Sequence, residues 1–413
     1  MTRWFYLFLL VSAVALSTAT QAAVHKKAAS KGKPKKAIPV TPVDSGLAEA
    51  RLIDVYQLVA KSQSREALTR AEGLVRDYPN FQLAQLIYGD LLSTRVREVK
   101  ALGDVQELGS KTAAAVLGEL REESQKRLKA LRERPPTGAI PSQFLSLAPR
   151  TRHAIAIDAS RSRLYLFENQ ASGLNLVADY YVSIGKLGYE KMAEGDLRTP
   201  LGIYFITGSM NPRTLKEFYG SGALPINYPN ELDNRRGKTG SGIWLHGTPP
   251  NQFARAPLAT DGCVVLANPD LNSIIRTVQV RNTPVFIARN LHWVKPTQAR
   301  QESRPFEATL SAWQGAKSRA NAAQMLSFYS PEFNSHGKAL AEWSQAVRRQ
   351  LDKSRGHPVQ FKDLSMLRWT DSTDTMVVTF SELTGSPQTG IHKRQYWERR
   401  GNQWKIFYEG VIG

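Results

Sequence analysis

The hydrophobic positions divide the chain into three stretches with different periodicities. In residues 47–134, apolar side chains recur at helical spacing. In residues 152–289, short runs of β-forming residues alternate between apolar and polar and are separated by segments rich in glycine and proline. In residues 304–413, helical patterns precede a series of strand-like runs. The pattern predicts a multidomain protein: an N-terminal α-helical region, a central mostly-β domain and a C-terminal α+β domain.

The N-terminal region contains a spacing typical of tetratricopeptide (TPR) repeats. Ala67, Ala71, Leu74 and Pro79, followed by Gly89 in the next predicted helix, fit about one and a half units of that repeat. An ordinary helical hairpin fits the same pattern, so a TPR-like region and a plain hairpin both remain open.

A long, charged helix is predicted from about residue 105 to 132, and Pro135-Pro136 ends it. Helices of this kind often serve as association surfaces. We expect this region to contact a second copy of the chain, as in a homodimer, or another protein partner.

The central stretch is predicted to carry its chemistry at strand ends. His246 ends one strand and Cys263 begins another, and a helix starts at Asn268-Pro269 with Asn268 as its N-cap. The other predicted strands cover residues 153–157, 164–167, 178–184, 203–206 and 283–288.

The C-terminal stretch predicts helices followed by an antiparallel meander, which suggests a sheet wrapped around helices. Turn signals at 370–372 and 400–402 fit hairpins between the later strands. The predicted helices cover 306–314 and 339–351, and the predicted strands cover 359–369, 375–383, 391–399 and 403–408.

The first residues resemble an export signal. Arg3 precedes an apolar run from Trp4 to Ala19, and Ala22-Ala23 offer small residues for cleavage, which predicts a signal peptide at 1–23. A basic linker rich in lysine, alanine and proline is predicted to be disordered over 24–46. An uncleaved membrane anchor is the alternative. With either outcome, the rest of the chain lies outside the cytoplasm.

The net charge of the chain indicates which kind of partner it binds. The chain has 55 Lys and Arg against 36 Asp and Glu, a net charge of +19, which favours an anionic surface nearby. Export argues against nucleic acid, and the sequence has no Gly-rich phosphate loop, zinc-finger spacing or RNA-binding aromatic motif.

Cys263 is the only cysteine of the chain and is the main candidate for chemistry. An exported chain would rarely keep an idle free thiol, so the residue is either inert in the core or kept for reactivity. His246 is the candidate base, and the Gly247 carbonyl could hold the second ring nitrogen. Gly262, directly before the cysteine, lets the backbone approach the substrate, and the amides of Gly262 and Cys263 are candidate oxyanion donors.

A zinc site is the rival interpretation. His246, Asp261 and Cys263 are ligand types, but a catalytic zinc needs three well-spaced ligands and usually more histidine or cysteine. The other histidines lie far away in sequence or outside this stretch. We therefore expect no metal and no other cofactor.

The motif resembles that of a known family. His246-Gly247, a gap, and then Thr-Asp-Gly-Cys at 260–263 resemble the signature of L,D-transpeptidases with a YkuD-type catalytic domain. Residues 182–186 and 195–204 resemble the segments that line the substrate cleft in that family. The resemblance covers about residues 152 to 289.

The resemblance implies roles for particular residues. Cys263 would be the nucleophile and His246 the general base and proton donor, with the amides around Gly262 and Cys263 as oxyanion donors. It also implies substrate contacts from four residues near the motif: Thr260, Asp261, Lys186 and Thr199.

Two positions depart from the family pattern. Many members carry a second histidine where this chain has Asp261, and an arginine where it has Val265. An unpaired Asp261 would oppose formation of a thiolate. Losing the arginine removes an anchor for a substrate carboxylate.

The order of the three stretches resembles that of helical-cell-shape L,D-carboxypeptidases, whose C-terminal domain is NTF2-like (nuclear transport factor 2-like). The resemblance implies a periplasmic enzyme that acts on peptidoglycan stem peptides. L,D-transpeptidation is the favoured activity. L,D-carboxypeptidation, which trims a tetrapeptide to a tripeptide, and an inactive cell-wall binding protein are the alternatives.

Overall fold

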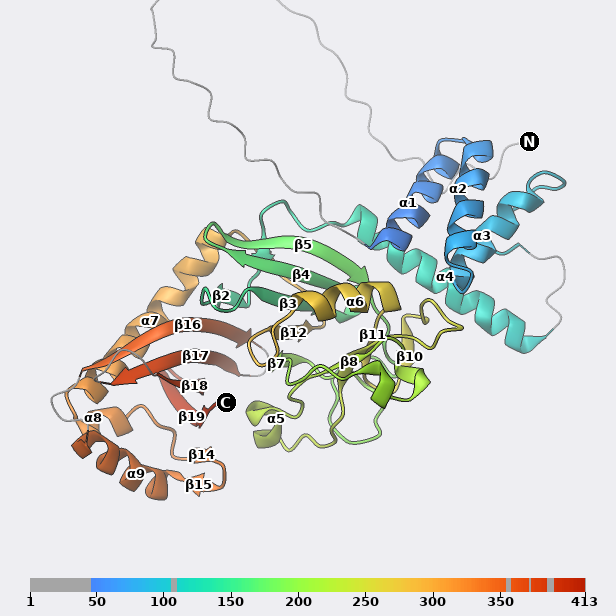
Figure 1. The fold of residues 1–413 in the computed structure, drawn as a ribbon. Coiled ribbons are helices and arrows are strands. Elements are labelled where there is room, and N and C mark those ends of the chain that lie inside the picture. The colour runs from blue at the N-terminus through green and yellow to red at the C-terminus, as the bar shows by residue number, and fades with distance from the viewer. Residues whose placement is uncertain (1–45, 105–109, 354–357, 371–372, 385–389, 413) are drawn as a thin grey trace, which may run out of the picture.

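The computed structural model in Figure 1 describes residues 46–104, 110–353, 358–370, 373–384 and 390–412. The predicted signal peptide and nearly all of the predicted linker lie outside the described residues. N-terminal helices pack at one end of the molecule, a mixed β domain lies in the middle and an α+β domain lies at the other end (Figure 1). The predicted fold class is confirmed.

The N-terminal region consists of helices α1 (Leu47–Ala60), α2 (Ser64–Asp77), α3 (Gln82–Ser93) and α4 (Lys111–Arg132). Helix α1 packs against α2, and α2 packs against α3. Ala67, Ala71 and Leu74 are buried between these helices, as the apolar spacing requires. The first part of the predicted long helix, residues 105–109, lies outside the described residues.

A buried network of charges joins these helices to the central domain. Glu49 of α1 accepts hydrogen bonds from Arg127 of α4 (2.8 Å) and from Arg163 at the start of a central strand (2.7 Å). Arg127 also pairs with Glu123, and Arg163 pairs with Asp179. Burial alone would raise the pKa of Glu49, but the two arginines outweigh it and lower that pKa. The carboxylate is therefore charged and serves both cations.

Replacing Glu49 with glutamine is expected to lower the free energy of unfolding by about 3 kcal/mol, because two buried guanidinium groups lose a shared counter-ion. Urea denaturation followed by circular dichroism measures the change. Asp77→Asn is the matched control, since Asp77 pairs with Arg51 at the surface of the same helices. Equal urea midpoints for the two variants would show that the network does not stabilise the contact between the N-terminal helices and the central domain.

The central domain is built on a five-stranded sheet in the order β5-β4-β3-β12-β7. Strand β12 runs parallel to β3 and antiparallel to β7, so the last predicted strand lies inside the sheet. The strands are β3 (His153–Asp158), β4 (Arg163–Gln170), β5 (Gly173–Tyr181), β7 (Gly202–Phe205) and β12 (Pro284–Ala288).

Smaller sheets carry the predicted chemistry. Strands β8 (Ala223–Pro225), β9 (Trp244–His246) and β11 (Val264–Val265) form one sheet in the order β11-β9-β8. Strands β6 (Ile184–Gly185) and β10 (Leu258–Thr260) form another. Three helical turns, η1 (Ala159–Arg161), η2 (Pro212–Thr214) and η3 (Glu217–Tyr219), and two helices, α5 (Glu231–Arg235) and α6 (Asn268–Thr277), complete the domain.

The C-terminal domain has the predicted meander. Its sheet has the order β19-β18-β17-β16-β2, with β2 (Phe144–Ser146) supplied by the segment that precedes the central domain. The meander strands are β16 (Val359–Thr370), β17 (Asp374–Thr384), β18 (Ile391–Arg400) and β19 (Gln403–Val411). The helices are α7 (Pro296–Ser318), α8 (Ala322–Leu326) and α9 (Leu340–Lys353), and the short strands are β1 (Ile140–Pro141), β13 (Trp293–Val294), β14 (Asn334–Ser335) and β15 (Lys338–Ala339).

The C-terminal sheet has two packed faces. One face packs against the helices, where Trp397 of β18 and Trp313 of α7 are both completely buried. The other face packs against the central sheet, where the rings of Phe286 and Trp369 lie 5.4 Å apart. The two domains thus share an apolar interface. Within the described ranges, no helix combines the length and apolar content needed to cross a bilayer.

Candidate active site

Parallel pairing of β9 and β11 brings His246 and Cys263 to one cavity. Val264 lies opposite Leu245 and Val265 lies opposite His246, so Cys263, just before β11, lies beside the end of β9. Both side chains line a cavity of about 210 Å³. The structure therefore brings together the two residues on which the predicted chemistry depends, although 16 positions separate them along the chain.

The His246 ring is fixed in one tautomer. Its Nδ1 lies 2.7 Å from the carbonyl oxygen of Gly247. Because a carbonyl only accepts hydrogen bonds, Nδ1 carries the proton and Nε2 keeps a free lone pair. Burial, helped by the charge of Arg255, lowers the pKa of His246 to about 4, against the bond to Gly247. The imidazole is therefore neutral near pH 7 and able to accept a proton.

The Cys263 thiol is also neutral. Burial raises its pKa above the usual value, Asp261 acts in the same direction, and the Trp244 amide and Arg255 act against it. The sulfur lies 3.5 Å from the carbonyl oxygen of Gly242, as a protonated thiol donor would. The resting site thus holds a thiol and an imidazole rather than a thiolate and an imidazolium.

The rate of Cys263 alkylation by iodoacetamide is expected to keep rising with pH beyond about 8.5, the pKa of free cysteine, because the pKa of this half-buried thiol is raised. The reaction reports on this residue alone, since the chain has one cysteine. Labelling is followed by protein mass, with free cysteine as the control. A plateau of fast labelling from about pH 5 to pH 8 would instead reveal a preformed ion pair.

Two threonines hold the turn before the nucleophile. Thr260 Oγ1 donates to the carbonyl of Cys263 (2.7 Å) and accepts from the N–H of Gly262 (3.1 Å). Thr199 Oγ1 donates to the carbonyl of Gly262 (2.9 Å) and accepts from the N–H of Gly185 (2.9 Å). Their hydroxyls are thus used within the protein, whereas the resemblance implied substrate contacts.

The Gly262 amide is also bonded within the protein, and its role as an oxyanion donor stays a prediction. Its N–H already serves Thr260, so it is not free to receive an oxyanion in this arrangement. The glycine itself is required: its φ is +126°, and a Cβ would lie 2.7 Å from the carbonyl oxygen of Arg198. Gly262 lets the 195–204 segment approach the cysteine turn.

Asp261 does not lie against the sulfur as an unpaired charge. It forms an ion pair with Lys186 at 2.9 Å, and the two side chains are 69% and 53% exposed. The sequence suggested that an unpaired Asp261 would oppose formation of a thiolate at Cys263. Pairing with Lys186 at the rim of the cavity weakens this effect. Lys186 and Asp261 therefore pair with each other in this structure. Contact of either residue with the substrate remains a prediction.

A third residue, Arg255, lines the same cavity and was missed by the sequence analysis. Its side chain is 9% exposed, and its guanidinium lies 4.3 Å from the centre of the Phe218 ring. Among the described residues, no carboxylate lies within ion-pair distance of it. Its only sequence signal was a cation between His246 and Thr260, which nothing distinguishes from a surface arginine.

Asn268 has a different role from the predicted one. Ala267 is the N-cap of α6, without a side-chain bond. The Asn268 side chain instead accepts from the amides of Ser221 (2.9 Å) and Thr248 (3.2 Å) and donates to the Thr248 carbonyl (2.8 Å). It thereby ties together two loops that flank His246 and Gly247.

The zinc alternative has no support from this arrangement. Nδ1 of His246 is used by Gly247, and Asp261 is paired with Lys186 at the rim. Over the part of the chain that the structure describes, no three His, Cys, Asp or Glu side chains gather as a metal site would require.

Comparison with known proteins agrees with this geometry. Residues 152–287 match the family model of the L,D-transpeptidase catalytic domain, YkuD. This segment is an L,D-transpeptidase catalytic domain. Residues 306–410 match the C-terminal NTF2-like domain of Cds6, so the chain joins an L,D-transpeptidase domain to an NTF2-like domain. The predicted resemblance is confirmed for both domains.

Solved structures show the same fold over most of the chain. Bd1075 of Bdellovibrio bacteriovorus has a TM-score of 0.57 and 24% identity, covering 66% of this chain and 98% of that one. Pgp2 of Campylobacter jejuni, a helical cell shape determining protein, has a TM-score of 0.51 and 21% identity, covering 70% and 100%. No curated protein sequence matches the chain.

Proposed function

We propose that the protein is an L,D-transpeptidase that cuts peptidoglycan stem peptides and carries them as a thioester on Cys263. The observation that carries this proposal is the shared cavity of Cys263 and His246, with the histidine tautomer fixed by Gly247, inside an L,D-transpeptidase domain. Domains of this family act on peptidoglycan, which lies outside the cytoplasm. We therefore also propose export to the periplasm, with the uncleaved anchor as the alternative.

Acylation begins as Nε2 of His246 takes the thiol proton while Sγ attacks the carbonyl carbon that precedes a terminal D-amino acid. The negative charge moves to the carbonyl oxygen. We assign the Cys263 N–H as its donor, because the Gly262 N–H is bonded to Thr260. The C–N bond then breaks, the His246 imidazolium gives its proton to the leaving amine, and the D-amino acid departs. A thioester to Cys263 remains.

Deacylation uses the same histidine. Nε2 of His246 takes a proton from the incoming acceptor, which attacks the thioester carbon. The C–S bond breaks, and the proton returns to the thiolate, so that Cys263 is again a thiol. An amine of a second stem peptide gives a crosslink, whereas water gives a shortened peptide.

The substrate anchor in this scheme is Arg255. It is a buried cation beside Cys263 without a carboxylate partner among the described residues. A guanidinium in such a place would hold a carboxylate of the stem peptide through paired hydrogen bonds. It would thus replace the arginine that the family pattern places where this chain has Val265.

Hydrolysis is the second candidate activity. Its support is the fold shared over 70% of the chain with Pgp2, a helical cell shape determining protein, together with the NTF2-like domain. In this case the protein would be an L,D-carboxypeptidase that trims tetrapeptide stems to tripeptides. An inactive cell-wall binding protein is the remaining alternative.

One experiment separates these functions. Purified full-length protein is incubated with tetrapeptide muropeptides, and the products are weighed by mass spectrometry. Crosslinked dimers with release of the D-amino acid indicate transpeptidation, and tripeptides alone indicate carboxypeptidation. If neither product forms while the muropeptide still binds, the protein is a binding module and the proposed enzyme function is wrong.

The N-terminal helices are proposed to contact a second copy or another protein, as their charged surface predicted. Helix α4 carries much of that surface, and its buried side pairs with Glu49. Light scattering of the exported form tests this proposal: a strictly monomeric mass would rule out the homodimer.

A further inference from the structure

A second cavity lies between the L,D-transpeptidase domain and the NTF2-like domain. It measures about 490 Å³, within the roughly 300–1,000 Å³ typical of sites for small ligands. One wall comes from the central domain: β7 with the loop after it, Asn227, Glu231 of α5 and Arg281 before β12. The other wall comes from β18 and β19. It shares no lining residue with the cavity of Cys263. It is therefore separate from the proposed catalytic site.

Arg394 of β18 places a buried positive charge in the wall of this cavity. Its side chain is only 7% exposed, and its guanidinium lies over the Phe205 ring, 3.2 Å from the ring centre. Nε donates to Thr379 Oγ1 at 3.2 Å. Within the described part of the chain, no carboxylate lies within 4 Å of it. Because a buried cation without a counter-ion is unfavourable, the site is built for an anion that comes from outside.

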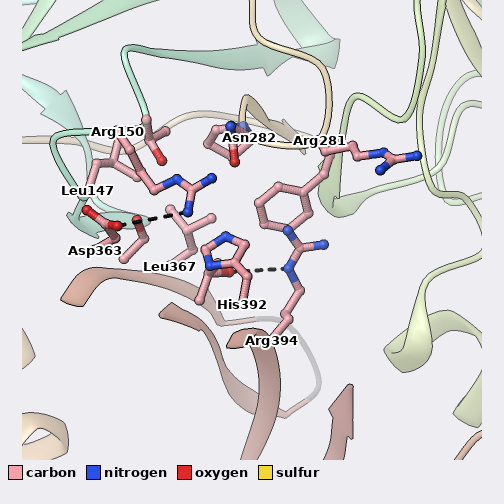
Figure 2. Close-up of a pocket in the computed structure, with 13 residues that line it drawn as sticks. Leu147, Arg150, Arg281, Asn282, Asp363, Leu367, His392 and Arg394 are labelled. Carbon is pink, nitrogen blue, oxygen red and sulfur yellow. Dashed lines mark hydrogen bonds and ion pairs between the residues drawn. The ribbon is translucent and has the colours of Figure 1, made fainter. Parts of the chain in front are cut away.

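Arg394 lies between a narrow pocket and the larger cavity, and only the larger cavity has room for a ligand. In the narrow pocket of Figure 2, Arg394 and Arg150 come from different walls, and the Arg281 guanidinium points out of this pocket. That pocket has only about 10 Å³ of free space, enough for a water molecule. The 490 Å³ cavity is lined by Arg394 and by Arg281, an exposed residue with a φ of +69°. A ligand would enter from this second side.

The chemistry of the lining selects among anions. A guanidinium matches a carboxylate through two parallel hydrogen bonds. The cavity also contains Glu231, whose carboxyl would repel a phosphate dianion but could accept an N–H. Tyr396 and Tyr408 add aromatic faces with hydroxyl groups. This combination fits the carboxylate end of a short peptide better than a phosphate.

We propose that this interdomain cavity binds the carboxyl end of a short peptide, with Arg394 as its buried anchor and Arg281 as its outer cation. Binding there needs no chemistry at Cys263. The site would give the NTF2-like domain a peptide-recognition role of its own, and failure of the catalytic proposal would leave this inference unaffected.

The test uses full-length protein carrying Cys263→Ala and Arg255→Met, so that the catalytic cavity neither reacts nor offers its proposed anchor. The probes are N-acetyl-alanyl-D-alanine, its C-terminal amide and inorganic phosphate, titrated by ligand-observed NMR. We expect the acid to bind and the amide to bind at least tenfold more weakly. Adding Arg394→Met should weaken binding of the acid at least tenfold, and adding Arg281→Met should weaken it severalfold.

Arg150→Met is the matched control. Arg150 lines the narrow pocket of Figure 2 but not the 490 Å³ cavity, so its replacement should leave the affinity unchanged. Melting temperature shows whether the Arg394 variant folds, and the exposed Arg281 carries the test if it does not. Equal binding of acid and amide, tighter binding of phosphate, unchanged affinity in both arginine variants, or no binding at millimolar probe would each overturn the proposal.

Discussion

Replacing Cys263 with alanine is expected to lower turnover of tetrapeptide muropeptides by about a thousandfold or more, because the variant lacks the sulfur that forms the acyl bond. His246→Gln is expected to have an effect of similar size. In that variant, the imidazole no longer takes the thiol proton, and burial holds the pKa of Cys263 above its usual value. Product formation followed by mass spectrometry measures both losses.

His153→Gln is the matched control for the histidine. His153 lies on β3, where it contacts Gln279 at 3.1 Å, and it does not line the catalytic cavity. Turnover should be unchanged in this variant. Combining Cys263→Ala with His246→Gln should cost little more than either change alone, because the two groups act as a unit. Additive losses would indicate that the two residues work independently.

Replacing Arg255 with methionine is expected to lower kcat/KM for an anionic stem peptide by about 10- to 100-fold, mainly through KM. The size follows from losing a charge-assisted hydrogen bond, worth about 1.5–3 kcal/mol. The guanidinium is buried beside Cys263 and stacks on Phe218, and no carboxylate of the described residues pairs with it, so it can take a substrate carboxylate. Steady-state kinetics with a tetrapeptide measures the change.

The control for Arg255 uses the substrate as well as the protein. Amidating the stem-peptide carboxylates should reduce kcat/KM of the original protein by a similar factor and leave the Arg255→Met variant almost unaffected. Arg213→Met, in the exposed turn η2, should change neither value. If Arg255→Met loses as much activity with the amidated peptide, the arginine supports the loop rather than the substrate.

Periodicity was sufficient to predict the fold class because it reports on local burial. The C-terminal strands were predicted within a few residues. Strands β16, β18 and β19 each contain a continuous buried run, because one face of the sheet packs on helices and the other on the central sheet. Periodicity does not reveal strand order. The position of β12 inside the central sheet, and the contribution of β2 to the C-terminal sheet, depend on distant pairing.

In the active site, too, the sequence revealed the residues with a local motif but not those whose role depends on distant contacts. The Thr-Asp-Gly-Cys motif and His246 could be found because their residue types and spacing carry chemistry. Arg255 and Asn268 could not, because their roles depend on loop paths. The Asn-Pro pair fits an N-cap locally, but a loop packed against α6 takes the Asn268 side chain. Likewise, only the fold shows that Thr260 occupies the Gly262 amide.

The measurement that tests the central claim most directly is intact-protein mass spectrometry during turnover of a tetrapeptide, with the free thiol titrated in parallel. The account predicts a covalent adduct equal to the substrate less its terminal D-amino acid, located on the peptide that contains Cys263, and a matching loss of free thiol. Product formation while Cys263 keeps its free thiol throughout, or an adduct that persists in Cys263→Ala, would contradict it.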